Sequence, residues 1–233
     1  MTIREKSIMS TPIHAVIFDH DGTLVNSEPV HMKCWQEVLR NYNAELSQED
    51  YNRHLSGMPS IYSATWLAAK FNLDIEPGAL LSSKQKLLQE FLTIQGFPLM
   101  PGVDTLLQYL QQKRIPLAVA TGAGRDEVTH SLTFHKMTSY FQAVVCKDDV
   151  AQNKPAPDVY QLAATRLQVP TENCIAIEDS DNGEKSARAA GMRCLRFQYA
   201  ENKPAQAVVG GFLNYDGIHH WLIERLDAGQ TGL

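Results

Sequence analysis

The sequence predicts an α/β protein, a doubly wound parallel sheet into which an all-helical domain is inserted. Short apolar runs alternate with amphipathic helical segments along most of the chain, which is the pattern of a parallel sheet with helices on both faces. Residues 26–98 interrupt this alternation and contain no convincing strand. Acidic residues directly follow two of the apolar runs, as expected at the carboxyl ends of parallel strands, where α/β proteins bind their ligands.

The elements of the predicted sheet follow from this alternation. The alternation predicts five strands, at residues 14–18, 116–120, 142–146, 174–177 and 193–197. Amphipathic segments predict helices at residues 103–113, 125–135, 157–167, 182–190 and 215–226. Gly191 is in the position of a helix C-cap after the fourth helix. Together these elements assign residues 12–25 and 99–228 to one core domain.

The inserted segment, residues 26–98, is predicted to be a separate helical domain. Ser27 and Ser47 are candidate helix N-caps. Apolar side chains recur on one face of two of its helices, at Val30, Cys34, Trp35, Val38 and Leu39, and at Leu80, Leu81, Leu87, Leu88, Phe91 and Leu92. These stripes indicate a small bundle with its own core. The chain would cross between the domains near residues 24–27 and 97–102.

Composition excludes some classes of function. With 233 residues, of which 44% are hydrophobic and 20% charged, the chain can bury a sizeable core. The net charge of -5 and the lack of a Lys/Arg block argue against a general affinity for nucleic acid or an anionic membrane. No apolar run is long enough for a membrane span. The four cysteines lack metal-like spacing and are expected to be reduced thiols of a cytoplasmic protein.

Two carboxylates, Asp19 and Asp21, stand one residue apart directly after the first predicted strand. Two such charges about 4 Å apart repel by roughly 4 kcal/mol at an effective dielectric constant near 20. The pair therefore requires a cation or a shared proton. A second strand also ends in acids, Glu178 and Asp179, while Lys154 offers a fixed positive charge between the two stretches.

Four stretches of the chain resemble, in order, the motifs of the haloacid dehalogenase superfamily of phosphoryl-transfer enzymes. They are Asp19-His20-Asp21-Gly22-Thr23, a strand-ending Thr121, Lys154-Pro155-Ala156-Pro157-Asp158, and Glu178-Asp179-Ser180 followed by Gly183. The resemblance extends from residue 13 to about residue 197 and implies a Rossmann-like core. The helical insertion after the first strand is similar to the cap of the β-phosphoglucomutase-like branch, which closes over the crevice.

The resemblance implies a role for each motif residue. Asp19 would attack phosphorus to form an aspartyl-phosphate. Asp21 would protonate the departing alcohol and later accept a proton from the attacking water. Thr121 would hydrogen-bond a phosphate oxygen, and Lys154 would neutralise both Asp19 and the transferring phosphoryl group.

The resemblance also implies a Mg²⁺ cofactor. Its ligands would be Asp19, the main-chain oxygen of Asp21, and Asp179. Glu178 would be either a further ligand or an acceptor outside the metal's ligand set, and the sequence leaves both interpretations open. Asp181 is predicted to be the N-cap of the helix that follows.

Substrate contacts are predicted in both domains. Gly22 would let the backbone approach the phosphate, and the N–H groups of Gly122 and Ala123 would bind it. In the inserted domain, Gly57 and Lys84 are the candidate substrate-binding residues, although Lys84 could equally lie on a solvated helix face.

Histidines are assigned no catalytic role by the sequence. Alternation along an extended chain should turn His20 away from the two acids, so His20 is interpreted as structural. His31 is interpreted in the same way, as a packing or surface residue.

The predicted function is a magnesium-dependent phosphatase that hydrolyses a small phosphorylated metabolite, with a sugar phosphate as the favoured class. The alternative is a phosphosugar mutase of the β-phosphoglucomutase type. Those mutases carry a cap arginine that grips the far phosphate, whereas this chain has Ser60 near that place, which favours hydrolysis. A regulatory protein without activity is disfavoured because all four motifs are intact. The expected partner is a small phosphorylated substrate, and the expected state is a monomer or weak homodimer.

Overall fold

The computed structural model describes residues 12–197, 211–212 and 214–228. The chain divides into two compact units. We call the segment Asn26–Pro98 the helical unit, and the chain through Val25 and from Leu99 onward the core unit. Each unit is described by itself below.

The described residues of the core unit form a six-stranded parallel sheet in the order β3-β2-β1-β4-β5-β6. The strands are β1 (Ala15–Phe18), β2 (Leu117–Ala120), β3 (Ala143–Val145), β4 (Cys174–Glu178), β5 (Arg193–Phe197) and β6 (Gly211–Phe212). The α/β fold class and the five predicted strands are confirmed. The sixth strand, β6, was not predicted, because two residues are too short to give a periodic signal.

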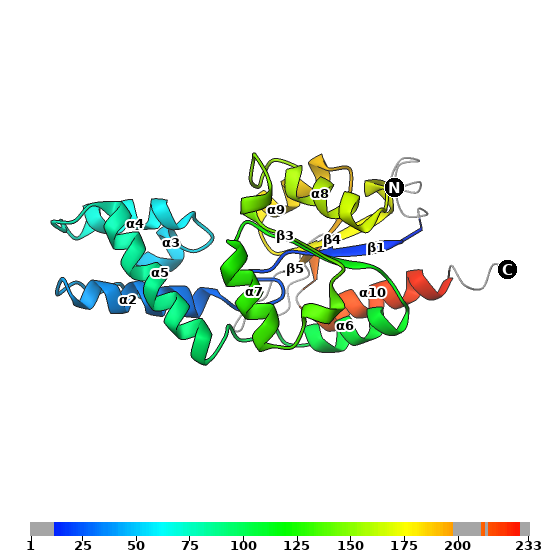
Figure 1. The fold of residues 1–233 in the computed structure, drawn as a ribbon, viewed down its shortest axis with the longest axis horizontal. Coiled ribbons are helices and arrows are strands. Elements are labelled where there is room, and N and C mark those ends of the chain that lie inside the picture. The colour runs from blue at the N-terminus through cyan, green and yellow to red at the C-terminus, as the bar shows by residue number, and fades with distance from the viewer. Residues whose placement is uncertain (1–11, 198–210, 213, 229–233) are drawn as a thin grey trace. The chain divides into compact units, whose positions relative to one another are not determined.

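Five helices and three short 3-10 helices accompany this sheet among the described residues. The α-helices are α6 (Val103–Gln112), α7 (Arg125–Phe134), α8 (Asp158–Leu167), α9 (Asp181–Ala189) and α10 (Tyr215–Ala228). The 3-10 helices are η1 (Thr138–Tyr140), η2 (Lys147–Asp149) and η3 (Thr171–Asn173). Helices α8 and α9 cover one face of the sheet, and α6 and α10 lie on the other (Figure 1). All five predicted helices are confirmed to within two residues at each end.

The central strands are apolar, except for Glu178 at the end of β4, because helices cover both faces of the sheet. Every residue of β1, β2 and β4 is buried. In the parallel register, Phe18 of β1 pairs with Val119 of β2 on one side and with Ile177 of β4 on the other. The residues that follow these three positions therefore leave the sheet at the same edge, which brings the motif residues together.

The helical unit contains α2 (Glu28–Arg40), α3 (Gln48–His54), α4 (Ser60–Lys70) and α5 (Pro77–Ile94). Its core includes the predicted Trp35, Val38, Leu39 and Leu80. Ser47 caps α3 as predicted, since its Oγ accepts a hydrogen bond from Asp50 N. Ser27 is the N-cap residue of α2, as predicted, but its side chain makes no capping hydrogen bond. Ser27 has helical backbone angles and accepts from Val30 N and His31 N through its carbonyl instead.

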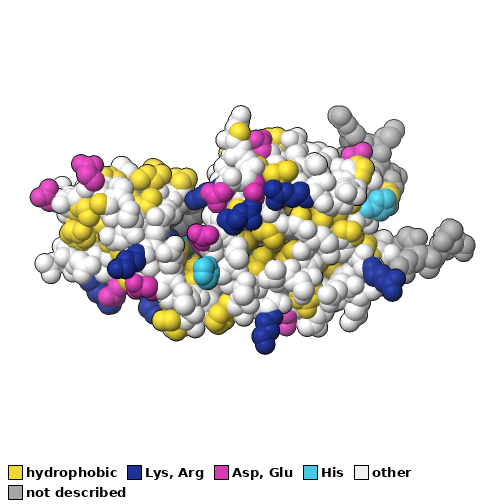
Figure 2. Space-filling view, viewed as in Figure 1, with side chains coloured by type: hydrophobic (Ala, Val, Ile, Leu, Met, Phe, Trp, Pro, Cys, Tyr) yellow, Lys and Arg dark blue, Asp and Glu magenta, His cyan; other side chains and the backbone are white. Residues whose placement is uncertain are grey.

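The described residues show mixed surface charge, no membrane-spanning helix and free cysteines. On the face drawn in Figure 2, acidic and basic side chains are interspersed rather than gathered by sign. None of the helices among residues 12–197 and 214–228 has the length and apolar character needed to cross a bilayer. All four cysteines are free, and burial raises the pKa of the Cys146 and Cys174 thiols to about 11.

Candidate active site

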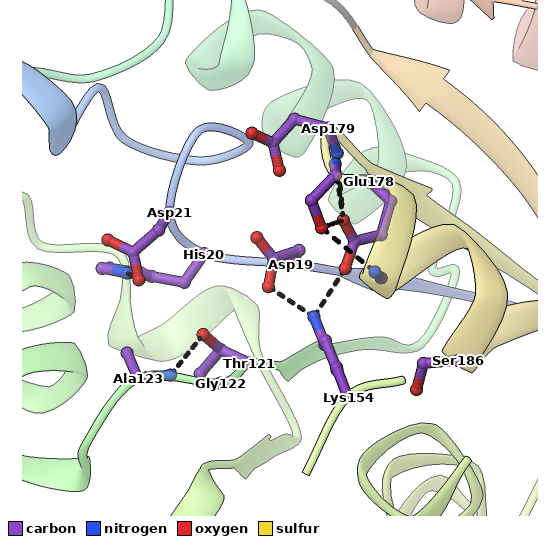
Figure 3. Close-up of polar contacts among 12 residues, drawn as sticks. Asp19, His20, Asp21, Thr121, Gly122, Ala123, Lys154, Glu178, Asp179 and Ser186 are labelled. Carbon is purple, nitrogen blue, oxygen red and sulfur yellow. Dashed lines mark hydrogen bonds and ion pairs between the residues drawn. The ribbon is translucent and has the colours of Figure 1, made fainter. Parts of the chain in front are cut away.

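The site lies at the carboxyl edge of the sheet, where four segments of the core unit bring their polar side chains together (Figure 3). Asp19 follows β1, and Thr121 follows β2. Glu178 is the last residue of β4, and Asp179 comes next. Lys154 reaches the same place from the loop before α8.

Lys154 is the electrostatic centre of the site. Its Nζ lies 2.5 Å from Asp19 Oδ1 and 2.6 Å from Glu178 Oε1, and its side chain is only 9% exposed. Burial by itself would lower the pKa of Lys154, but the carboxylates of Asp19 and Glu178 raise it above its usual value. The ammonium is therefore charged whenever these acids are ionised. Ser186 of α9 supports the loop, because its hydroxyl donates to the Ala156 carbonyl at 2.5 Å.

Glu178 is completely buried and its carboxylate is surrounded by protein donors. Oε1 accepts from Lys154 Nζ and, at 3.0 Å, from the hydroxyl of Tyr160. Oε2 accepts three hydrogen bonds of 3.1 Å, which come from Asp179 N, Ser180 N and Ser180 Oγ. A carboxylate offers about four lone-pair sites. These five bonds occupy them, so the geometry favours an anchoring role over metal ligation.

Asp19 and Asp179 carry the charge that lacks a full counterion. The ligand atoms of Asp19, Glu178 and Asp179 lie within 4.8 Å of one another. Burial, followed by the Glu178 charge, raises the pKa of Asp19 to about 7 despite the opposing effect of Lys154. Burial, followed by the Asp19 charge, raises the pKa of Asp179 well above its ordinary value. Three carboxylates facing one ammonium leave a net negative charge, and the hard oxygens of Asp19 and Asp179 fit a divalent cation such as Mg²⁺.

Gly22 explains how Asp179 fits against the first motif. Its φ of +76° is in the left-handed region, and a Cβ there would lie 2.0 Å from Asp179 Oδ2. The group that approaches Gly22 is thus the Asp179 carboxylate. The turn is held by the His20 carbonyl, which accepts from Leu24 N and Val25 N, and by the Tyr215 hydroxyl, which donates to Thr23 O at 2.8 Å.

His20 differs from its sequence-based interpretation. The prediction that its ring turns away from the acids is wrong, because Nδ1 lies 3.4 Å from Asp21 Oδ2. The chain bends after Asp19, so the alternation of an extended strand no longer applies. Figure 3 shows the Asp21 side chain beside His20 and directed away from Asp179. Burial lowers the pKa of His20, but the charge and hydrogen bond of Asp21, together with the charges of Glu127 and Asp19, raise that pKa above its usual value.

Thr121 is buried, and its Oγ1 accepts a 3.0 Å hydrogen bond from Ala123 N. The prediction that the Ala123 N–H is presented to phosphate is therefore wrong for this conformation. The hydroxyl proton of Thr121 can still be donated to a phosphate oxygen. Helix α7 starts only at Arg125, and Gly122 lies beside Asn153, whose Nδ2 is 3.5 Å from the Gly122 carbonyl.

Helix α9 begins with Ser180 as its N-cap. Ser180 Oγ accepts from Gly183 N at 3.0 Å while it donates to Glu178. The prediction that Asp181 is the cap is wrong, since Asp181 is the first helical residue. Its carboxylate pairs with Arg196 at 3.0 Å.

Two predicted substrate-binding residues lie in the helical unit. Lys84 is 3% exposed, so the alternative that it lies on a solvated face is wrong. Its Nζ is 2.9 Å from His31 Nδ1 and 5.9 Å from the Trp35 ring centroid. The Gly57 N–H donates to Glu28 Oε1 at 3.0 Å. His31 also packs edge-on against Phe97, in agreement with its interpretation as a packing residue.

Tyr160 of α8 was missed by the sequence analysis. Its side chain is completely buried, and its ring centroid lies 5.0 Å from Lys154 Nζ. Burial, followed by the Glu178 charge, raises the pKa of the Tyr160 hydroxyl well above its usual value, so the hydroxyl keeps its proton and donates. An aromatic residue at this place in a helix fits an ordinary core position. The only available signal was its closeness in sequence to the Lys154 motif.

Comparison with known proteins agrees with this geometry. Residues 16–197 match the family model of haloacid dehalogenase-like hydrolases. The chain is 36% identical over 178 residues to the fructose-1-phosphate phosphatase YqaB of Escherichia coli, covering 76% of this chain and 92% of that protein. It is 30% identical over 185 residues to a phosphorylated carbohydrates phosphatase of Thermotoga maritima, covering 77% and 82% of the two chains.

A solved structure shows the same likeness. The crystal structure of a putative β-phosphoglucomutase from Thermotoga maritima has a TM-score of 0.74 at 26% identity, and the match covers 91% of this chain and 99% of that one. The fold and the site define a phosphoric monoester hydrolase. The chain belongs to the haloacid dehalogenase-like hydrolase family.

Proposed function

We propose that this enzyme is a magnesium-dependent phosphatase that hydrolyses a small sugar phosphate through an aspartyl-phosphate on Asp19. The observation that carries the proposal is the 2.5 Å contact between the buried Lys154 ammonium and Asp19 Oδ1 at the end of β1. It holds a carboxylate beside a fixed positive charge, where an incoming phosphoryl group would also be neutralised. The phosphatase relatives from E. coli and T. maritima support the sugar-phosphate class.

The proposed reaction has two displacements at phosphorus. Asp19 attacks phosphorus, the bond to the ester oxygen breaks, and that oxygen takes a proton from Asp21. Water then attacks the aspartyl-phosphate and gives its proton to Asp21, and the bond from phosphorus to Asp19 breaks to release phosphate. Lys154 offsets the charge on Asp19 and on the phosphoryl oxygens, while the Thr121 hydroxyl donates to one of them.

The metal-binding residues in this proposal are Asp19, Asp179 and the main-chain oxygen of Asp21. A bound Mg²⁺ would supply charge stabilisation for the phosphoryl oxygens. We propose that Glu178 anchors Lys154 and is not itself a ligand, because its oxygens already accept five hydrogen bonds. Gly22 gives Asp179 the space to reach the first motif.

Substrate selection is proposed to involve Gly122 in the core unit, and Gly57 and Lys84 in the helical unit. The Lys84 side chain is buried rather than on the surface, and its amino group carries hydrogen-bond donors that suit the recognition of an anionic or hydroxylated substrate. We further propose that the enzyme acts on a cytoplasmic metabolite as a monomer or weak homodimer. The competing activity, a phosphosugar mutase, is supported by the similarity to the putative β-phosphoglucomutase.

The test is a panel of sugar phosphates assayed for free phosphate and for isomerised product. We expect phosphate release that stops with EDTA, returns with Mg²⁺, and falls by at least about a thousandfold in Asp19→Asn. Asp104→Asn, on the exposed first turn of α6, is the matched control and should retain activity. Isomer formation in excess of phosphate would establish the mutase instead, and turnover by Asp19→Asn would contradict the assigned nucleophile.

A further inference from the structure

One aromatic residue contacts both charged partners in the centre of the site. The Tyr160 hydroxyl donates to Glu178 Oε1 at 3.0 Å, and its ring centroid lies 5.0 Å from Lys154 Nζ. The same Glu178 oxygen accepts from Lys154 at 2.6 Å. Tyr160, Glu178 and Lys154 thus form a closed set of contacts, which we call the lysine clamp.

The lysine clamp restricts the motion of the Lys154 side chain. Its four-carbon stem is flexible, and holding its ammonium in one place costs rotamer entropy. Glu178 is fixed from the other side by Asp179 N, Ser180 N and Ser180 Oγ, so it is a rigid acceptor. The Tyr160 ring adds a cation–π contact with the ammonium, 5.0 Å from its centroid to Lys154 Nζ.

The position of Tyr160 is itself well determined. Its side chain is packed in the buried cluster between α8 and the sheet, with Ile17, Ala118 and Ala176 among its members. The loop that carries Lys154 is held separately, by Ser186 at the Ala156 carbonyl. Because a phenylalanine would fill the same space, the hydroxyl is the part that packing does not require.

We propose that Tyr160 is a positioning residue, which acts through Glu178 to hold the Lys154 ammonium against Asp19. The proposal rests on the proposed function in that Lys154 is taken to act in phosphoryl transfer. The effect of Tyr160 is transmitted by the shared Oε1 oxygen of Glu178.

The experiment is a double-mutant cycle of Tyr160→Phe and Glu178→Gln, with Tyr140→Phe as the matched control in η1. We expect Tyr160→Phe to lower kcat about tenfold and leave KM within about twofold, since a hydrogen bond to a charged acceptor is lost while the ring remains. In the Glu178→Gln background, Tyr160→Phe should change kcat by less than about twofold. Tyr140→Phe should resemble wild type.

The cycle is also measured on the urea midpoint, which needs no turnover. The changes in urea midpoint caused by Tyr160→Phe and Glu178→Gln should also be non-additive, because the two substitutions remove the same interaction. Three results would overturn the role of Tyr160. They are an equal loss of kcat from Tyr160→Phe in the wild-type and Glu178→Gln backgrounds, an unchanged kcat in Tyr160→Phe, and additive changes in the urea midpoint. A wild-type protein that turns over no phosphoester would instead contradict the proposed function. If Glu178→Gln does not fold, Lys154→Gln replaces it in the cycle.

Discussion

A Cβ atom on Gly183 would lie 1.7 Å from Oε1 of Glu178. No side chain can be accommodated at that distance, so α9 approaches the end of β4 only because residue 183 is glycine. The close approach lets Ser180 cap α9 and bond Glu178 at once. Gly183 is therefore a structural requirement of the Glu178 anchor.

Gly183→Ala tests this requirement. The added methyl should displace the Glu178 carboxylate, lower the free energy of unfolding by about 1–3 kcal/mol, and reduce kcat. Gly78→Ala in α5 is the control, because nothing lies within 4 Å of its Cβ position and alanine favours a helix. Urea unfolding and steady-state kinetics measure both effects. A Gly183→Ala protein with unchanged stability and kcat would contradict the steric argument.

The raised pKa of Asp19 predicts a pH-dependent response to Mg²⁺. Its folded value of about 7 exceeds the ordinary 3.8, so the folded protein binds the extra proton and loses stability as pH rises through this window. A cation that binds ionised Asp19 must displace that proton. The rise in Tm caused by Mg²⁺ should therefore be small near pH 5 and increase towards pH 8. Thermal melts across this range check it, and a pH-independent rise would count against Asp19 as a ligand.

Lys154→Met should destabilise the folded protein. Methionine keeps the apolar stem but leaves the buried carboxylates of Asp19 and Glu178 without their cation, which costs about 3–5 kcal/mol of stability at neutral pH. The loss should shrink on acidification as Asp19 takes up a proton. Urea unfolding at several pH values measures it. Lys185→Met, on the exposed face of α9, should unfold like wild type at every pH.

Lys84→Met and Lys86→Met form a matched pair on α5. Lys84 is buried beside His31, whereas Lys86 is exposed. If Lys84 recognises the substrate, its replacement should raise KM for sugar phosphates about tenfold, and Lys86→Met should leave KM unchanged. Melting curves of both variants separate binding from folding. Equal KM values for the two would refute substrate binding by Lys84.

Much of the core unit could be predicted from local patterns. Apolar runs and their alternation with helical segments predicted the five longer strands, and helical periodicity predicted α6 to α10. Parallel strands end at one edge, so Asp19, Thr121 and Glu178 could be placed near one another before any coordinates. Side-chain direction was less predictable, as His20 shows. Its ring contacts Asp21 because the chain bends there, and a bend removes the alternation on which the prediction relied.

Contacts between side chains that are far apart along the chain could not be predicted from the sequence. Lys154 and Asp19 are separated by 135 positions, and only the folded chain shows that Glu178 and Tyr160 share the same ammonium. Likewise, only the coordinates assign the cap of α9 to Ser180 and bury Lys84.

Residue type and local periodicity are properties of short segments. They were enough to predict the fold class, the ends of the strands and the four motifs. Which oxygen meets which donor depends on how those segments pack in three dimensions. A shift of about an ångström decides whether Glu178 receives five hydrogen bonds or offers a free oxygen to a cation, since hydrogen-bond strength falls steeply with distance and angle.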